Sequence, residues 1–524
     1  PADRVTRIIE PKKLADLGAV SVYDMGENIS GYPVVAATED GAYITVRCSE
    51  EINADGTLNF DSCDPGQIQC DEYRNAKKGE ECMPWFTWHG FRYFELTNNA
   101  KPVRCEVVHS DCAVTSAFES DSEMLNWLYD AYIRTQLSNM HSGVPSDCPH
   151  IERLGYTGDG QLCCEAAMML LDSQKFYQKW LEDISDCQST DNGHVQHTAP
   201  FMGGGGGPAG WGGAIAVVPY EMYKIYGDRE TFRRYLPKIL RYFDYLDSRS
   251  SGGLVCREEQ GGWCLGDWCT PEPIAICEPF VNTALCVKQM LMTKEAAEAI
   301  GEKETAQMLG RRIEEKRQAI LNAYYSPQTG SFIGDVQGAN SFATDIGLGG
   351  ERAYENTRKK YSAADSFDTG IFGTDILTRV LFERGDANTA FRLLTSEGKG
   401  SFYNMKKQGA TTIWENWDGE RSHSHPMFGA ATRYLFSFIL GITQEKTSAG
   451  YEHILIAPQI PDGLNYASGH ITTVRGKISV TFKRTESEAD FYVTVPQRAR
   501  FTYGSGCEFE LRDGENHIHI DFEE

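Results

Sequence analysis

The sequence predicts a multidomain protein in which a domain of helices stands between two domains of β-strands. Three observations support this prediction. At 524 residues the chain is longer than one ordinary hydrophobic core can organise, so two to four domains are expected. Apolar and polar residues alternate near both ends of the chain, whereas segments with a helical period fill its middle. We place the domain boundaries at 1–115, 116–445 and 446–524.

The N-terminal zone has the pattern of β-strands. "AYITVRCSEEI" alternates through Tyr43, Ile44, Val46 and Cys48, and the aromatic-rich "WFTWHGFRYFEL" also favours strands. Turn residues interrupt this zone repeatedly, and no long segment within it has a helical period.

The middle zone alternates helical segments with long irregular ones. Ser120 followed by Glu123 has the spacing of a capping box and predicts the start of the first helix. Sheet-like alternation is scarce between the helices, which favours an all-α toroid over a βαβ array. Further helices are predicted at 161–184, 229–247, 280–300, 303–324, 373–395 and 427–441.

The C-terminal zone returns to strands after "SAGYEHILIAPQIP". "GKISVTF", "FYVTV" and "IHIDF" each place three apolar residues on one face, which predicts a small antiparallel sandwich. The apolar positions are Ile478, Val480, Phe482, Phe491, Val493, Val495, Ile518, Ile520 and Phe522.

Charge and hydropathy exclude several classes of partner. The net charge of −24 argues against nucleic acid or an anionic membrane surface, because both bind basic patches. No stretch approaches the roughly 18 consecutive apolar residues that a membrane span requires. The composition suits a neutral ligand.

The cysteines indicate the compartment. None of the 16 forms a CxxC pair, and a domain of this size does not need disulfides, so a reducing compartment is favoured. No signal-peptide pattern is present, and the sequence begins with Pro1 rather than Met. We expect a cytoplasmic protein, with the periplasm or secretion as the alternative.

Four irregular loops of the middle zone, 144–161, 201–214, 261–273 and 409–429, together hold five of the nine Trp, and all but 201–214 also carry acidic residues. Aromatic rings stack on the apolar faces of sugars while carboxylates bind their hydroxyls. A single loop of this kind is better explained by a Trp that packs in the core and by acids that face water than by a binding site. Four such loops on one helical domain favour a sugar site.

Hydrolysis of a glycoside needs two carboxyl groups in different electrostatic environments. Glu152 has Tyr156 nearby in sequence, and Glu415 lies between Trp414 and Trp417. Partial desolvation by such rings raises the pKa of a carboxyl toward that of a general acid. The sequence therefore offers Glu152 and Glu415 as a candidate pair.

Ordered motifs resemble those of a known family. "DCPHIERLGYTGD", "GATTIWENWDG" and "SHSHPMFG" are similar to the α-L-rhamnosidases of glycoside hydrolase family 78. "YDMGENISGYP" and "FTWHGFRYFEL" resemble the β-sandwich that precedes that family's catalytic domain, and "ILIAPQIPDGL" resembles the start of its C-terminal sandwich. The resemblance implies an all-α (α/α)6 barrel flanked by antiparallel β-sandwiches. It also implies release of terminal α-L-rhamnose from a glycoside or oligosaccharide, with inversion and without a cofactor.

The resemblance also assigns roles to residues. Glu152 matches the general acid, and Glu415 matches the general base that activates water. The residues that match substrate-contacting positions are Asp147, Arg153, Tyr156, Asp159, Trp211, Asp267, Trp268, Trp414 and His425.

The chain departs from the family pattern at three places. The segment between Pro149 and Glu152 is one residue shorter, Tyr156 replaces the more usual Trp, and Gly213 stands where an Asp is expected. These departures leave the exact sugar or aglycone open.

Two further features of the sequence could indicate a different chemistry. "HVQH" at 194–197 and "HSH" at 423–425 resemble metal ligands, but no HExxH is present, so we expect no catalytic metal and treat His423 as ordinary polar packing. The glycine run 203–207 lacks the Lys-Ser/Thr of a phosphate loop, and we expect backbone to pass close to a pocket there. Two alternatives remain: a helical-toroid glycosidase with another sugar specificity, and a non-catalytic carbohydrate-binding protein.

Overall fold

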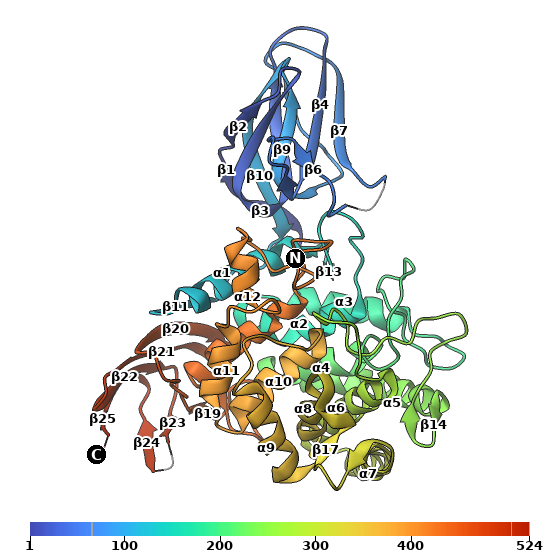
Figure 1. Cartoon of the computed structure of the whole chain (residues 1–524), viewed down its shortest axis with the longest axis vertical. Coiled ribbons are helices and arrows are strands. Elements are labelled where there is room, and N and C mark those ends of the chain that lie inside the picture. The colour runs from blue at the N-terminus through green and yellow to red at the C-terminus, as the bar shows by residue number, and fades with distance from the viewer. Residues whose placement is uncertain (64–65, 505, 523–524) are drawn as a thin grey trace.

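The computed structural model describes residues 1–63, 66–504 and 506–522. Figure 1 shows an N-terminal β domain above a body of helices, with the C-terminal sheets against one side of that body. The predicted order of β, α and β is thus confirmed. Within the described residues, no helix has the length and apolar character needed to cross a bilayer.

The N-terminal domain is built around the 18-residue strand β3, which pairs antiparallel with β2, β8, β9 and β10. The predicted alternation is confirmed, because Ile44, Val46 and Cys48 are buried in one apolar cluster while Tyr43 faces solvent. The strands are β1 (Asp3–Ile9), β2 (Lys12–Asp16), β3 (Val20–Ala37), β4 (Ala42–Ser49), β5 (Glu51–Ile52), β6 (Leu58–Asn59), β7 (Gln69–Ala76), β8 (Glu81–Cys82), β9 (His89–Thr97) and β10 (Ala100–Ser110).

The helical domain has an inner ring of helices, each in contact with the next and the last in contact with the first. In ring order these are α2 (Thr157–Leu170), α4 (Ala214–Tyr226), α6 (Glu278–Ala299), α8 (Ala339–Asp345), α10 (Ile371–Glu383) and the 3₁₀ helix η2 (Met427–Thr432). Packed outside this ring are α1 (Glu123–Ser138), α3 (Gln174–Asp186), α5 (Arg229–Ser248), α7 (Lys303–Tyr324), α9 (Gly350–Tyr361) and α11 (Ala387–Leu394). Short elements between them are α12 (Phe402–Lys407), η1 (Ile333–Gly338), the π-helix η3 (Leu435–Ile439) and the two-residue hairpins β12–β13 (140–145), β14–β15 (250–255) and β16–β17 (325–332).

Several helix predictions need correction. The predicted helix 161–184 is two helices, α2 and α3, because Leu171 adopts an extended backbone and ends α2. The predicted helix 373–395 is likewise divided into α10 and α11, with Gly385 in the left-handed region at φ 77° between them. The segment 427–441 forms 3₁₀ and π turns rather than one α-helix. The sequence reading also missed α4, α8, α9 and α12.

The start of α1 also differs from the prediction. Ser122, not Ser120, caps this helix, and its side chain accepts from the backbone N–H of Leu125. Ser120 remains the last residue of strand β11 (Ser116–Ser120), where it lies opposite Ala467. Ser120 therefore belongs to the strand, although the capping-box spacing had assigned it to the start of the helix.

The C-terminal domain has two sheets. The predicted apolar rows are confirmed, since Ile478, Val480, Phe491 and Val493 are buried between the sheets and the helices. The antiparallel prediction is wrong in one place, because β19 and β23 pair in parallel. One sheet has the order β11, β20 (Tyr466–Thr473), β21 (Gly476–Arg484), β22 (Glu488–Val495) and β25 (Gly514–Asp521); the other has β18 (Ile442–Gln444), β19 (Ile454–Ile456), β23 (Ala499–Tyr503) and β24 (Cys507–Leu511).

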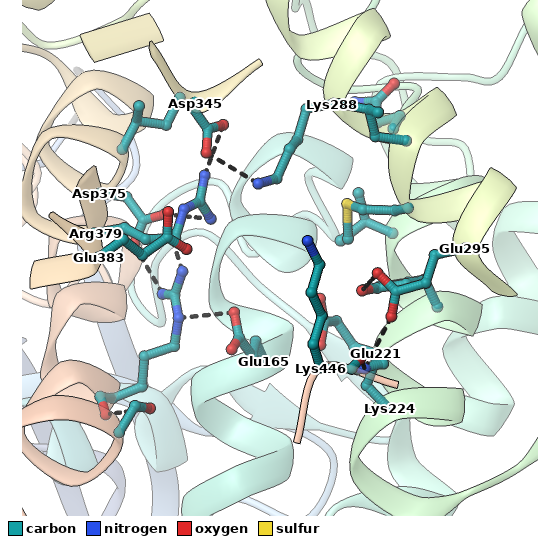
Figure 2. A pocket seen from close by; sticks show the side chains of 18 of the residues that line it. Glu165, Glu221, Lys224, Lys288, Glu295, Asp345, Asp375, Arg379, Glu383 and Lys446 are labelled. Carbon is teal, nitrogen blue, oxygen red and sulfur yellow. Dashed lines mark hydrogen bonds and ion pairs between the residues drawn. The ribbon is translucent and has the colours of Figure 1, made fainter. Parts of the chain in front are cut away.

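Ion pairs connect the inner helices around a cavity of about 930 Å³ (Figure 2). Asp345 of α8 binds Lys288 of α6 at 2.9 Å and Arg379 of α10 at 2.8 Å. Arg433, directly after η2, binds Asp375 of α10 at 2.8 Å and Glu165 of α2 at 2.8 Å. These pairs join neighbouring helices of the ring: α8 to α6 and α10, and the residue after η2 to α10 and α2.

A substitution of Arg433 tests how much these ion pairs stabilise the fold. Replacing this arginine in the variant Arg433→Met leaves the buried Asp375 with Arg379, at 4.0 Å, as its remaining cation, and we expect the free energy of unfolding to fall by about 3–5 kcal/mol. Urea unfolding followed by far-ultraviolet circular dichroism measures this loss. The control is Lys294→Ala, which breaks an exposed pair with Glu298 on α6 and should cost about 0.3–0.5 kcal/mol. Equal losses in the two variants would contradict a special role for Arg433.

Candidate active site

Two of the predicted acids lie on the loop between β13 (Val144–Pro145) and α2. Asp147 is buried, and its Oδ1 accepts from the backbone N–H of Leu154 at 2.9 Å while Cys148 Sγ donates to Oδ2 at 3.0 Å. The carbonyl of Leu154 in turn accepts from the N–H of Asp147. These bonds close the loop on itself, and Arg153 takes a positive φ of 53° within it. Glu152 stands at the turn of this closed loop.

Asp159 and His425 form the buried centre of the site. Asp159 lies in the first turn of α2, and His425 Nε2 is 2.9 Å from its Oδ1. The other ring nitrogen of His425 is 3.7 Å from Glu415 Oε2. One imidazole therefore stands between an acid of α2 and the acid of the distant "IWENWDG" loop.

The charges of this centre are shifted by burial and by one another. Burial lowers the pKa of His425, but its hydrogen bond to Asp159 and the negative charges of Glu415, Asp159 and Asp147 outweigh burial and raise the pKa to about 9. Burial raises the pKa of Asp147 to about 7, against the opposing charge of His425. The site thus holds a cationic imidazole among carboxyl groups at neutral pH.

Arg421, which the sequence reading missed, contacts both candidate catalytic carboxyls. Its Nη2 is 3.1 Å from Glu152 Oε1, and its Nε is 3.3 Å from Glu415 Oε1. The side chain of Glu152 is 28% exposed and that of Glu415 is 10% exposed. The predicted pair is therefore brought together, in two environments that differ in their access to water.

Aromatic rings cover the glycine run 203–207 from several sides. A Cβ on Gly204 would lie 2.9 Å from the ring of Tyr156, and one on Gly206 would lie 2.5 Å from Trp211. The ring of Trp263 likewise lies against Gly205. Glycine is needed at 204–206 because the backbone approaches these rings more closely than a Cβ allows, whereas a Cβ at Gly203 would meet nothing.

Two predicted contact residues have other partners. Both carboxylate oxygens of Asp267 accept backbone N–H groups at the start of α10, from Gly370 at 2.7 Å and from Phe372 at 2.9 Å. The guanidinium of Arg153 lies 4.4 Å from the ring centre of Trp88 in the N-terminal domain, outside the carboxyl cluster. These two side chains therefore support neighbouring segments of the protein.

The remaining predicted aromatic residues vary in exposure. Trp268 is half-buried, and its backbone carbonyl accepts from Ile371 at the start of α10. Trp414 is buried and stacks on His423, with ring centres 4.2 Å apart. His423 is thus the packing residue that the sequence reading expected.

At Gly213, where the family pattern has an acid, the space is already filled. Gln289 of α6 occupies it, and its side-chain amide donates to the carbonyl of Ala209 at 2.9 Å. A side chain at 213 would collide with this amide. The loss of the acid is therefore matched by a neighbouring residue that takes its place.

The N-terminal domain also reaches the site, through Glu50. This carboxylate is buried; Asn28 donates to its Oε1 at 2.8 Å, and the backbone N–H of His423 donates to its Oε2 at 2.9 Å. His150 Nε2 lies 3.2 Å from the same oxygen. Glu50 thereby binds both the loop that carries Glu152 and the loop that carries Glu415. The sequence did not predict this role, because Glu50 is distinguished there only by the adjacent Glu51 and by its place at a strand end.

Family models match almost the whole chain. The bacterial alpha-L-rhamnosidase concanavalin-like domain matches residues 16–114, the six-hairpin glycosidase domain of the same family matches 113–439, and its C-terminal domain matches 441–502.

Individual relatives agree with these matches. An alpha-L-rhamnosidase of Streptomyces avermitilis is 29% identical over 99% of this chain and 53% of its own length, and one of Alteromonas sp. is 28% identical over 91% and 54%. The chain therefore spans about half the length of the curated relatives it matches.

Solved structures show the same fold. The Streptomyces avermitilis alpha-L-rhamnosidase complexed with L-rhamnose superposes with a TM-score of 0.89 at 26% identity, covering 99% of this chain and 54% of that one. The alpha-L-rhamnosidase from Dictyoglumus thermophilum gives 0.91 at 22% identity, covering 100% and 64%.

The variant Asp159→Asn tests the electrostatics of the centre. Removing this carboxylate should move the pKa of His425 from about 9 toward its ordinary value of 6.5. A raised His pKa stabilises the fold fully below pH 6.5, and this stability is lost as the pH rises through about 9. The variant should therefore lose most stability relative to wild type below pH 6.5 and least above pH 9.

Nuclear magnetic resonance of isotope-labelled histidine measures the titration of His425 directly. The titration of His423 is the internal control, because this residue pairs with Glu51 rather than with Asp159. An unchanged titration of His425 in the variant would contradict the pairing.

Proposed function

The chain belongs to the bacterial alpha-L-rhamnosidase family, and we propose that it is an inverting α-L-rhamnosidase that releases terminal α-L-rhamnose from a glycoside or oligosaccharide. One observation carries the proposal. Glu152 and Glu415, on loops far apart in sequence, both contact the guanidinium of Arg421. A pair of carboxyls on two sides of one small space is what acid–base hydrolysis of a glycoside requires.

In the proposed mechanism Glu152 is the general acid. It is the more exposed member of the pair, on the side where a leaving group has access to solvent, and Tyr156 forms a side-chain hydrogen bond with it. Its proton passes to the glycosidic oxygen as the bond from that oxygen to the anomeric carbon breaks.

Glu415 is the proposed general base. Its Oε2 accepts from the N–H of Ser422 at 3.3 Å, and the cationic His425 and Arg421 lie on either side of the carboxylate. These contacts orient it to take a proton from a water molecule, which attacks the anomeric carbon from the face opposite the leaving group. The sugar is released with inverted configuration.

The separation of the two carboxyls is compatible with inversion, which is proposed from the family. The contacts of Arg421 limit the distance between Glu152 Oε1 and Glu415 Oε1 to at most about 9 Å, within reach of the about 6.5–9.5 Å of inverting pairs. Such a spacing leaves room for the attacking water.

The sugar itself is proposed from the family and from the buried polar groups. Asp147, Asp159 and His425 provide donors and acceptors for hydroxyls beside Glu415. The Streptomyces relative was solved with L-rhamnose, which supports the same sugar here. Tyr156, at a position where the family more often has Trp, favours a variation in the aglycone rather than in the chemistry.

The type of helical barrel and the compartment of the protein are also proposed. The closed ring of helix contacts supports an (α/α)6 barrel within 116–445, although β11 and β18, at the two ends of that range, pair with strands of the C-terminal sheets. Many of the cysteines, among them Cys48, Cys105 and Cys163, are buried like small apolar side chains, which supports the proposed reducing, cytoplasmic compartment.

The substrate is tested with aryl glycosides. We expect release from an aryl α-L-rhamnoside and none from the α-glucoside, and proton NMR of the first product should show the inverted anomer. Release from the glucoside alone would favour another glycosidase of this fold. Binding of rhamnose without any turnover would favour a carbohydrate-binding protein.

The roles of the two acids are tested with Glu152→Gln and Glu415→Gln. Each should lower kcat by about 10²–10⁴-fold with little effect on folding, because each removes a proton transfer in the transition state. Glu420→Gln, an exposed acid of the same loop as Glu415, is the matched control and should keep wild-type turnover. A variant of Glu152 or Glu415 that turns over like wild type would remove that residue from the mechanism.

A further inference from the structure

A second cluster of ionisable side chains lies apart from the proposed pair. It consists of His194 and His197, on the loop between α3 and α4, and Glu258, on the loop between α5 and α6. All three are buried, and their ligand atoms lie within 4.8 Å of one another. His197 Nε2 is 2.9 Å from Glu258 Oε2, and His194 Nε2 is 3.2 Å from Oε1.

Hydrogen bonding alone does not account for this arrangement. Glu258 Oε1 already accepts from the hydroxyl of Tyr245 at 2.5 Å and from the N–H of Glu259 at 2.9 Å. Although His194 is buried, its Nε2 approaches Glu258 Oε1 at 3.2 Å without forming a well-aligned hydrogen bond among the described residues. A buried ring nitrogen without a good hydrogen bond is costly, and its place beside a carboxylate and a second imidazole fits a cation between them.

We propose that His194, His197 and Glu258 bind a divalent metal ion of the zinc class. Two imidazoles and one carboxylate are a common donor set for zinc, and three protein ligands leave one coordination position open. Bonds of about 2.0–2.2 Å in tetrahedral geometry separate ligand atoms by roughly 3.3 Å. The cluster therefore has to open only slightly to hold the ion, and the ring nitrogens release their protons on binding.

The ion would connect two loops that border the proposed active site. The N–H and Oγ1 of Thr157 donate to the carbonyl of His197, at 2.8 and 3.0 Å, two residues before Asp159. On the other loop, Gly262 packs against the side chain of Glu258 and leads to Trp263, whose ring covers the glycine run. The site is structural, and it stands whether or not the proposed hydrolysis is correct.

The test uses the full chain, stripped with a chelator and titrated with zinc chloride in a calorimeter. We expect one zinc ion per chain with a Kd below about 1 μM, and a rise in Tm with zinc concentration. Cobalt(II) in place of zinc should give visible absorption bands of a tetrahedral site. His194→Asn and His197→Asn should each weaken zinc binding by at least about 100-fold and abolish those bands.

The matched control is His519→Asn. His519 lies with Glu488 and Asp521 in a partly exposed cluster of similar composition, and its loss should leave zinc binding unchanged. Absence of saturable binding by wild type up to about 1 mM zinc would overturn the proposal, leaving a hydrogen-bonded cluster only. Binding that survives in His194→Asn, or that is lost only in His519→Asn, would also overturn it. If the variants do not fold, the wild-type stoichiometry and cobalt spectrum decide.

Discussion

The buried carboxylate of Glu50 is the contact on which the geometry of the candidate site depends. It comes from the N-terminal β domain, yet it binds the backbone of His423 and approaches the ring of His150. These residues belong to the two loops that carry Glu415 and Glu152. A buried acid must have partners, and the two loops supply them, so the position of the β domain and the spacing of these loops are set together.

The inner helices contribute both to the candidate site and to the ion pairs that join the helical domain. Asp159 lies at the first turn of α2, and the N–H groups that begin α10 bind Asp267, so helix N-termini face the site. Their partial positive charge is favourable beside carboxylates. The inner helices also carry the ion pairs around the cavity in Figure 2, such as Arg433 with Asp375 of α10. The same ring of helices thus positions groups at the candidate site and is held together by buried ion pairs.

The sequence motifs predicted the candidate site best where a functional residue and the side chains around it lie on the same loop. Glu152, Asp147 and Tyr156 share a short segment, and the structure keeps them together. Arg421 was missed because nothing near it in sequence marks it as the contact of two acids, one of them 269 positions away. Asp267 was assigned to the substrate as a weaker match to the family's motifs, but the start of α10 uses both of its oxygens.

The sequence by itself determined the order of β, α and β zones, the apolar faces of the strands and the loops rich in Trp and acids. These are local properties, since periodicity and residue type act over a few positions. The tertiary structure decided where helices break, the parallel pairing of β19 with β23, and which side chains meet at His425, Arg421 and Glu258. Those outcomes depend on partners far along the chain, and burial rather than local propensity selects them.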